Sequence, residues 1–384
     1  MTRRSPRILV CPQEFKGSLT AREATSAIAE GAAAALGDSA QIQELPLADG
    51  GPGTVDVCVA ITGAERIFTT VTGPFGQAQS ASYGLMKNSD DFSAVIESAA
   101  ACGLVLVPPD DRHPNRASTH GVGELILDSL EKGARRIVIG VGGTCTNDGG
   151  AGAAQALGIR LLDQSGTEIP RGTLNMMRLA SLDTEKIHPE LSNAELCLAV
   201  DVNNPLLGAN GATAIYGPQK GACDWQLPGF DEALSTWVTT IEDALNLSLA
   251  NLPGAGAGGG LPIGLLAATH AAGGSISIES GAALVGDLVK LRKAIANADL
   301  VVTGEGSTDS QTAFGKTVSH VASLSAEIGT RCCVISGNID GLPDGVIDSE
   351  VSTPPGSSVE EALLLGSQPI RLAAKKLIER TISR

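Results

Sequence analysis

Five carboxylates in this chain stand close to glycines, and two lysines lie in similar loops. The acids are Asp49, Asp148, Asp201, Glu305 and Asp309, and the lysines are Lys16 and Lys220. Carboxylate oxygens bind Mg²⁺ or accept the proton of a hydroxyl group, and lysines neutralise phosphate charge. This combination favours Mg²⁺-assisted phosphoryl transfer. A single acid in such a context is usually a helix cap, so another enzyme class and a non-catalytic binding module stay open as alternatives.

The densest glycine cluster lies at 140–152, directly after the apolar, β-branched residues 137–139. The apolar run predicts a buried strand, and the alanine-rich residues 151–157 predict the start of a helix. Glycines let backbone N–H groups approach a ligand, so strand, loop and helix N-terminus together predict an anion-binding cradle. The residues expected to form it include Gly142, Gly143, Thr144, Thr146, Asn147, Asp148, Gly149 and Gly150.

Lys16 lies in the first predicted loop, between a short strand at 7–11 and a helix at 19–36. Thr20 and Glu23 have the spacing of a capping box, which places the helix start next to this lysine. A lysine near a helix N-terminus suits a phosphate or carboxylate ligand. A solvated loop lysine is the alternative interpretation.

The remaining acids also sit at the ends of predicted strands. Asp49 opens a glycine-rich turn, for which a helix cap is the alternative, and Asp201 ends a strand expected at 195–202. Glu305 and Asp309 are four residues apart after another apolar run. They could converge on one cation if their loop curls into a helical turn.

Several familiar site patterns are missing. Residues 315–317 read Gly-Lys-Thr, but Ser310 stands where a Walker loop needs its first glycine. Residues 254–259 spell GxGxxG, yet they follow a predicted helix and run into Pro262, so we expect a flexible or close-packed loop. A nicotinamide dehydrogenase therefore lacks its motif. The histidines show no zinc-site spacing, and there is no GxSxG nucleophile elbow.

Composition narrows the class of protein and its partners. A length of 384 residues predicts two domains, and 43% hydrophobic with only 3% aromatic residues favours aliphatic α/β layers. A net charge of -15 disfavours nucleic acid and anionic membranes as partners. We find no secretory or membrane-spanning apolar run, and the eight cysteines lack CxxC spacing, so a cytoplasmic protein with reduced thiols is expected.

Patterning also indicates how the chain is divided. From Phe68 onward, short alternating segments predict strands of a second domain or a new sheet. Apolar stripes predict helices at 119–130 and 234–245. The polar, proline-bearing residues 340–358 resemble a linker most closely.

Seven sequence blocks carry a resemblance to a known family. They are FKGSL (15–19), LPLADGG (45–51), GVGGTCTNDGGAG (140–152), DVNNPL (201–206), YGPQKGA (216–222), PGAGAGGGL (253–261) and TGEGSTDSQT (303–312). In this order they resemble the bacterial glycerate kinases of the glycerate 2-kinase type. The resemblance implies ATP- and Mg²⁺-dependent phosphorylation of D-glycerate to 2-phosphoglycerate. It also implies an α/β fold with a discontinuous Rossmann-like domain (1–70 and 290–384), an inserted α/β domain (71–289) and an active site in the cleft between them.

Each candidate residue has an expected role in such a kinase. The catalytic candidates are Asp201, Asp309, Asp49 and Lys16, with Asp201 the first choice of base because it ends a buried strand. The metal-ligand candidates are Glu305, Asp309 and Asp201. The ATP-binding candidates are Gly142, Gly143, Thr146, Asn147, Asp148, Gly149, Gly150 and Lys220. ATP and a small hydroxyl acceptor are the expected partners, and the expected assembly is a homodimer.

The chain departs from the family pattern in several loops. It has Gln13 and Glu14 within PQEFK where PDSFK is usual, Pro52 where DGGEGT has Glu, and Ser307 where TGEGR has Arg. Thr144 and Cys145 replace Ser and Ala. Glu14 adds a carboxylate and Ser307 removes a cation, so an acceptor pocket lined by them would disfavour a substrate carboxylate. A neutral polyol or cyclitol is therefore the alternative acceptor, and a catalytically weakened ligand-binding relative is the second alternative.

Overall fold

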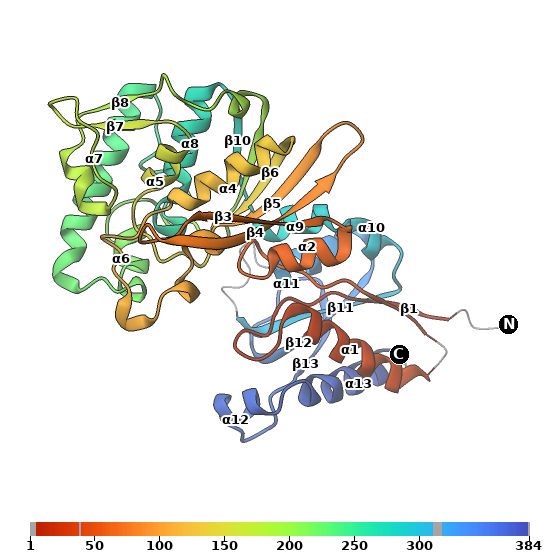
Figure 1. Cartoon of the computed structure of the whole chain (residues 1–384). Helices are drawn as coiled ribbons and strands as arrows, with labels where there is room; N and C mark the ends of the chain where they lie inside the picture. The colour runs from red at the N-terminus through yellow and green to blue at the C-terminus, as the bar shows by residue number, and fades with distance from the viewer. Residues whose placement is uncertain (1–4, 38–39, 310–316, 383–384) are drawn as a thin grey trace. The chain divides into compact units, whose positions relative to one another are not determined.

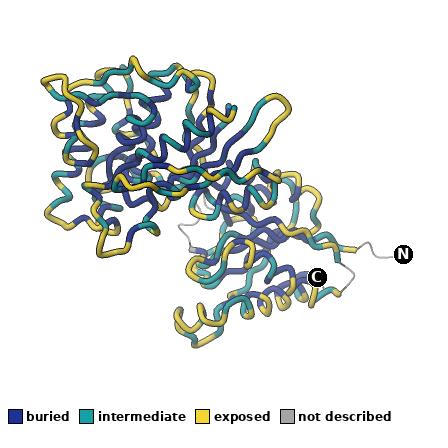
Figure 2. Tube along the Cα trace, in the orientation of Figure 1, coloured by how far each residue is buried: buried dark blue, intermediate teal, exposed yellow. Residues whose placement is uncertain are grey.

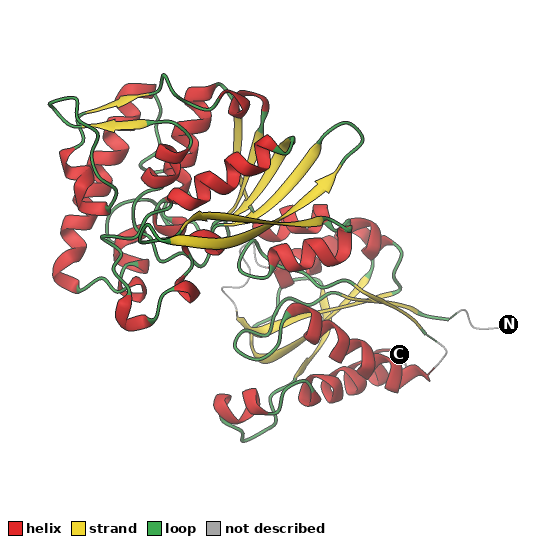
Figure 3. Ribbon diagram, viewed as in Figure 1, coloured by secondary structure: helices red, strands yellow, loops and turns green. Residues whose placement is uncertain are grey.

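The computed structural model describes residues 5–37, 40–309 and 317–382 (Figure 1). Contacts divide the chain into two compact units. Unit 1 comprises Met1–Asp49, Asp56–Thr62 and Ser280–Arg384, and unit 2 comprises Gly50–Val55 and Gly63–Glu279. Both units combine helices with a sheet, as Figure 3 shows, so the expected α/β class is confirmed.

Unit 1 is built on a five-stranded sheet in the order β13-β12-β11-β1-β2, and all its paired strands are parallel. Its elements are β1 (Arg7–Val10), α1 (Ala21–Leu36), β2 (Gln41–Glu44), α2 (Thr54–Thr62), α9 (Gly281–Leu288), α10 (Leu291–Ala296), β11 (Leu300–Asp309), α11 (Thr317–Ile328), β12 (Arg331–Asp340), β13 (Val346–Val351), α12 (Val359–Leu364) and α13 (Gln368–Ile382). The first two residues of α2 belong to unit 2.

Strand β1 shows why this sheet carries helices on both faces. Ile8 and Val10 pack in one buried cluster with α1 and α13, whereas Leu9 packs in another with α10 and α11. Successive side chains of a strand point to opposite faces, so an unbroken apolar strand needs cover on both sides. Helix α1 begins at the predicted capping box, in which Thr20 and Glu23 bond each other's backbone N–H groups.

Unit 2 has a six-stranded sheet in the order β10-β9-β6-β5-β4-β3. Strands β10, β9, β6 and β5 run parallel, and the pairs β5–β4 and β4–β3 are antiparallel. Its elements are β3 (Glu65–Thr72), β4 (Ala78–Lys87), β5 (Phe92–Glu97), α3 (Ala99–Cys102), α4 (His120–Glu131), β6 (Ala134–Gly140), α5 (Ala151–Ala156), β7 (Arg160–Leu162), β8 (Ser181–Asp183), β9 (Glu195–Ala199), α6 (Ala212–Tyr216), α7 (Leu227–Leu245), α8 (Leu261–Ala272) and β10 (Ser275–Glu279). The predicted strands after Phe68 and the helices at 119–130 and 234–245 are confirmed.

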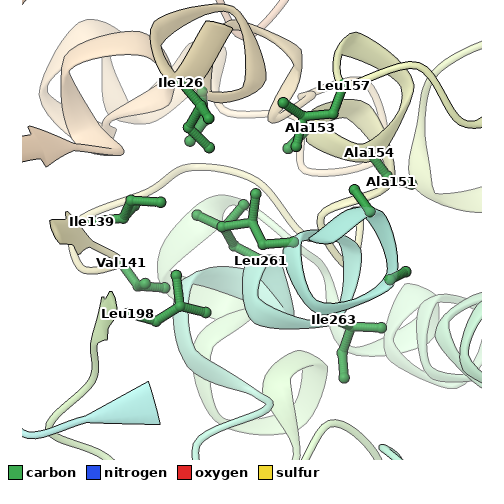
Figure 4. Packing of buried hydrophobic residues seen from close by; sticks show 14 of the residues in the cluster. Ile126, Ile139, Val141, Ala151, Ala153, Ala154, Leu157, Leu198, Leu261 and Ile263 are labelled. Atoms are coloured by element: carbon green, nitrogen blue, oxygen red, sulfur yellow. The ribbon is translucent and has the colours of Figure 1, made fainter. Parts of the chain in front are cut away.

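The core of unit 2 joins its sheet to helices α4, α5 and α8 (Figure 4). Ile139 of β6 and Leu198 of β9 share this cluster with Ile126, Ala153 and Leu261, and all five are fully buried. Figure 2 shows the contrast between these buried strands and the exposed residues 88–90 of the β4–β5 connection. Because β6 and β9 are fixed by this core, the loops that follow them have anchored starting points.

One expectation about unit 1 is wrong. Part of the stretch 340–358, expected to be a linker, forms the edge strand β13 beside β12. Its sequence VIDSEV has apolar residues mainly at the ends and no buried residue, which hides the strand from a hydrophobicity pattern.

No helix in the described part of the chain combines the length and apolarity needed to cross a bilayer.

Candidate functional site

Gly142 and Gly143 form an exposed turn directly after β6. Their N–H groups donate no hydrogen bond to another described residue. Among the described residues, a Cβ added at Gly142 would meet only the Cα of Gly51 within 4 Å, at 3.6 Å. Gly143 has φ of 76°, a conformation that glycine adopts without strain. This turn has the accessible backbone donors that an anion cradle requires.

The later glycines of the same loop serve close packing instead. Gly149 and Gly150 have φ of 61° and 75°. A Cβ on Gly149 would lie 2.5 Å from Cδ1 of Trp237, and a Cβ on Gly150 would lie 2.4 Å from the carbonyl oxygen of Leu261. The indole Nε1 of Trp237 also donates a 2.8 Å hydrogen bond to the carbonyl oxygen of Gly149. These glycines therefore bring the loop against α7 and α8.

Asp148 is buried and holds the start of α5. Its carboxylate accepts hydrogen bonds from the N–H and the hydroxyl of Thr119 at 2.8 and 3.0 Å, and from the N–H groups of Gly150 and Gly152, both at 3.2 Å. Burial raises the pKa of Asp148 above its usual value, although the hydrogen bonds oppose this shift. The expected contribution of the helix N-terminus to the cradle is wrong in this respect, because the Asp148 carboxylate and carbonyl and the Thr119 hydroxyl already accept hydrogen bonds from its first N–H groups.

Thr146 and Asn147 also lie on the buried side of the loop. The Asn147 Nδ2 donates to the Thr213 hydroxyl at 3.0 Å, and the Thr146 hydroxyl donates to the Gly258 carbonyl at 3.4 Å. The Asn147 Oδ1 is buried and has no hydrogen-bond partner among the described residues. Both side chains thus connect the loop to the rest of unit 2.

Lys220 lies beneath the same loop and is only 2% exposed. Its Nζ donates to the Thr146 carbonyl at 2.7 Å and to the Thr144 hydroxyl at 3.2 Å. Burial lowers the pKa of Lys220 to about 8, while Cys102, Cys145 and Asp148 oppose the shift. The sequence placed this lysine in a turn, and its burial under the glycine loop is visible only in the structure.

The glycine-rich stretch at 254–260 packs directly on this loop. A Cβ on Gly258 would lie 2.6 Å from the Val141 carbonyl oxygen, and one on Gly259 would lie 2.0 Å from that of Thr146. The carbonyl of Gly259 accepts a 3.0 Å hydrogen bond from the N–H of Gly149. Of the two interpretations of this GxGxxG spelling, a flexible loop or a close backbone approach, the structure shows the close approach.

The loop after Asp49 contributes a neighbour that the sequence did not reveal. A Cβ on Gly140 would lie 1.9 Å from the carbonyl oxygen of Gly50, and one on Gly143 would lie 3.2 Å from Cγ of Pro52. Gly50 also approaches the Cβ of Ala199 at the end of β9. Asp201, partly buried, follows that strand end by two residues. Gly50 to Pro52 thus lie against the ends of β6 and β9, beside the exposed turn.

In unit 1, four candidate residues gather at the carboxyl ends of β1 and β2. The Gln13 Nε2 donates a 2.7 Å hydrogen bond to Oδ2 of Asp49. Burial raises the pKa of the Glu14 carboxyl; Lys16 opposes this shift and Asp49 adds to it. Lys16 itself is exposed. The structure thus brings Lys16 and Asp49 together with Gln13 and Glu14, the two residues of the first loop that depart from the family pattern.

Glu305 and Asp309 do not share a helical turn, so that expectation is wrong. Both belong to the extended strand β11, where residues four apart are separated by about 13 Å. The Thr308 hydroxyl donates to Oε1 of Glu305 at 3.3 Å, and the side chain of Asp309 lies outside the described part of the chain. Gly306 follows Glu305 and packs on the first loop, since a Cβ added to it would lie 3.2 Å from the backbone nitrogen of Lys16.

Within the described part of the chain, no three His, Cys, Asp or Glu side chains form a potential metal site. The site residues therefore fall into two sets. One surrounds the exposed glycine turn of unit 2, and the other lies at the strand ends of unit 1.

Comparisons with known proteins identify the family of this chain. The sequence model of the glycerate kinase family matches residues 8–379. A glycerate kinase from Halalkalibacterium halodurans is 39% identical over 96% of this chain and 97% of its own length. The glycerate 2-kinase of Escherichia coli is 41% identical over 87% of this chain and 85% of its own length.

A solved structure extends the similarity to three dimensions. The crystal structure of a Salmonella typhimurium LT2 protein assigned as glycerate kinase 2 superposes with a TM-score of 0.85 at 38% identity. The match covers 99% of this chain and 98% of that one. This chain therefore belongs to the glycerate kinase family and is a phosphotransferase that acts on an alcohol group.

Proposed function

We propose that this chain transfers the γ-phosphoryl group of ATP to D-glycerate in the presence of Mg²⁺ and forms 2-phosphoglycerate. Family membership and the relatives named as glycerate kinases support the reaction. The observation that carries the proposal is the exposed Gly142–Gly143 turn, with accessible N–H groups and a buried lysine beneath it. Backbone donors and nearby positive charge suit the oxygens of a phosphate group.

The chemistry requires a base and a way to neutralise phosphate charge. A bond forms between the acceptor hydroxyl oxygen and the γ-phosphorus, and the bond from that phosphorus to the bridging oxygen breaks. The hydroxyl proton passes to a carboxylate, for which Asp201 is our first candidate and Asp49 and Asp309 are the others. Lys16, exposed beside Asp49, would bind a negatively charged oxygen.

Magnesium would supply charge neutralisation and orientation of the phosphates when bound. The carboxylates of Asp201, Glu305 and Asp309 are hard oxygen donors of the kind this ion prefers, and the described ones, Asp201 and Glu305, are only partly buried. We propose each of these three carboxylates separately as a ligand of the metal ion.

The reaction is tested by ADP release from ATP and D-glycerate, with Mg²⁺ and with a chelator. Phosphorus NMR identifies the product, because a phosphate on C2 couples to one proton and a phosphate on C3 couples to two. We expect Mg²⁺-dependent release and the one-proton splitting. A two-proton splitting would assign the other hydroxyl, and ATP binding without release would favour the ligand-binding relative.

A second acceptor class rests on Glu14. This partly buried carboxylate lies near Asp49 and Lys16, and it stands one position after Gln13, where the family pattern has its Asp. A neutral polyol or cyclitol would avoid repulsion from these acids. Comparing kcat/KM for D-glycerate, glycerol and a cyclitol distinguishes the two, since a clear preference for D-glycerate excludes the neutral acceptor.

A further inference from the structure

We propose that Lys220 is a positioning residue that acts through the glycine loop. It holds the loop from its buried side and gives the exposed Gly142–Gly143 turn a positive potential for an anionic ligand group, without touching that group. The inference rests on the proposed function, in which this turn binds a phosphate group.

The contacts of Lys220 place it under the loop. Its Nζ bonds both the carbonyl of Thr146 and the hydroxyl of Thr144. The Thr144 hydroxyl in turn donates to the Gly258 carbonyl at 2.9 Å. One ammonium group therefore ties together two positions of the loop, and through Thr144 it reaches the second glycine-rich stretch.

The backbone of Lys220 is itself held in place. Its N–H donates to the Gly217 carbonyl at 3.0 Å, in the short 3-10 helix Pro218–Lys220. The next residue, Gly221, has φ of 92°, and a Cβ there would lie 2.4 Å from the Arg112 carbonyl oxygen. A lysine presented from a fixed backbone can hold the loop in one position.

The charge of Lys220 has no close counterion in the part of the chain that the structure describes. Among the described residues, no carboxylate lies within ion-pair distance of its Nζ. The titratable groups around it are Asp148, Cys102 and Cys145, with Arg112 near Cys145. A buried ammonium that has hydrogen bonds but no counterion raises the free energy of the ligand-free protein, and a weakly screened field extends to the nearby turn. An anion bound on that turn would offset this cost.

A change of pH can separate the effect of the hydrogen bonds of Lys220 from the effect of its charge. A neutral lysine still donates hydrogen bonds to Thr146 and Thr144, so deprotonation removes the charge and leaves the contacts. Since the pKa of Lys220 is lowered to about 8, the affinity for an anionic nucleotide should weaken above that pH. A purely structural lysine would give no such change.

The experiment compares the full chain with Lys220→Met and Lys220→Arg, and uses Lys87→Met as the matched control because Lys87 is exposed on β4. Activity assays give kcat and KM for ATP, and calorimetry gives the affinity for ADP. Both are measured at pH values on both sides of about 8. We expect wild-type affinity and kcat/KM to fall by up to about tenfold per pH unit above the pKa. Lys220→Met should lose about tenfold or more below that pH and show no further fall.

Lys220→Arg keeps the charge, so its binding should stay constant across this range even if the level is reduced. Folding is checked by thermal denaturation and by the fluorescence of Trp237, which reports on the loop through Gly149. The exposed Trp225 is replaced by Phe in every variant to remove its signal.

The outcomes separate this inference from the proposed function. If the wild type shows no kinase activity, the proposed function fails, and the pH profile of ADP binding still decides the role of Lys220. If a folded Lys220→Met matches the wild type in KM, ADP affinity and pH profile, the inference is overturned while the function stands. A wild-type profile without the fall above about 8 overturns the role of the charge.

Discussion

The indole of Trp237 and the carbonyl of Gly149 couple helix α7 to the glycine loop through a 2.8 Å hydrogen bond. Trp237 is fully buried, and the Cα of Gly149 lies so near the indole that a Cβ would meet it at 2.5 Å. Any shift of the loop must therefore move or break this contact, and the tryptophan reports on it.

Gly149→Ala should destabilise the protein by about 2–4 kcal/mol, because the methyl group clashes with Trp237 and alanine is strained at φ of 61°. Chemical denaturation followed by fluorescence measures the change. Gly166→Ala is the control, since φ there is 77° but no atom of the described residues lies within 4 Å of its added Cβ. Equal losses in both variants would mean that packing against Trp237 contributes nothing.

Asp148→Asn should lower the free energy of unfolding by about 2–4 kcal/mol. The amide group of asparagine would face N–H and hydroxyl donors of Thr119, Gly150 and Gly152 that now bond a carboxylate. Thermal and chemical denaturation measure the loss, with the exposed Asp90→Asn as control. A stability unchanged from the wild type would show that these hydrogen bonds add no net stabilisation.

The stability of the wild type relative to Lys220→Met should increase with pH. The folded pKa of Lys220 is lowered to about 8 from 10.5, so the unfolded chain binds more protons between these values. The difference in unfolding free energy, wild type minus variant, therefore increases by about 3 kcal/mol in total across this pH window. Denaturation of both proteins at several pH values measures the difference, and a constant or falling difference contradicts the shift.

Gln13→Leu should lower kcat/KM for the acceptor by about tenfold to a hundredfold, because Asp49 loses the 2.7 Å hydrogen bond that orients it. Steady-state kinetics with the acceptor as the varied substrate tests this. Gln41→Leu, at an exposed position of β2, is the control. Unchanged kinetics in Gln13→Leu would remove Asp49 orientation from the proposed mechanism.

Glu305→Gln should raise the Mg²⁺ concentration needed for half-maximal activity by about tenfold, since an amide is a weaker ligand than a carboxylate. A Mg²⁺ titration of activity at saturating ATP measures the shift. The exposed Glu185→Gln serves as control. A titration curve that coincides with the wild type would exclude Glu305 as a ligand.

The strand and helix around the glycine loop were predictable because the pattern is local. Residues 137–139 are apolar and β-branched, and alanines follow the loop. The family could be recognised because seven blocks occur in order. The same local patterns could not show which glycines stay open, since Gly142 and Gly149 differ in backbone conformation and in what packs against them from distant parts of the chain.

The errors have a similar physical origin. Spacing alone could place Glu305 and Asp309 on one helical turn, but pairing of β11 with β12 keeps them extended. The polar strand β13 is held by backbone hydrogen bonds at a sheet edge, which leaves little trace in hydrophobicity. Site roles and the boundaries expected near 70 and 290 stay predictions.

The discontinuity of unit 1 constrains how the chain can fold while it is being synthesised. Strand β11 lies between β1 and β12, so β1 and β2 leave the ribosome more than two hundred residues before their sheet can be completed. The stretch 63–279 of unit 2 is continuous and emerges earlier. In a nascent chain that stops before β11, one backbone edge of the apolar strand β1 stays unpaired, which exposes the strand to aggregation and to proteases.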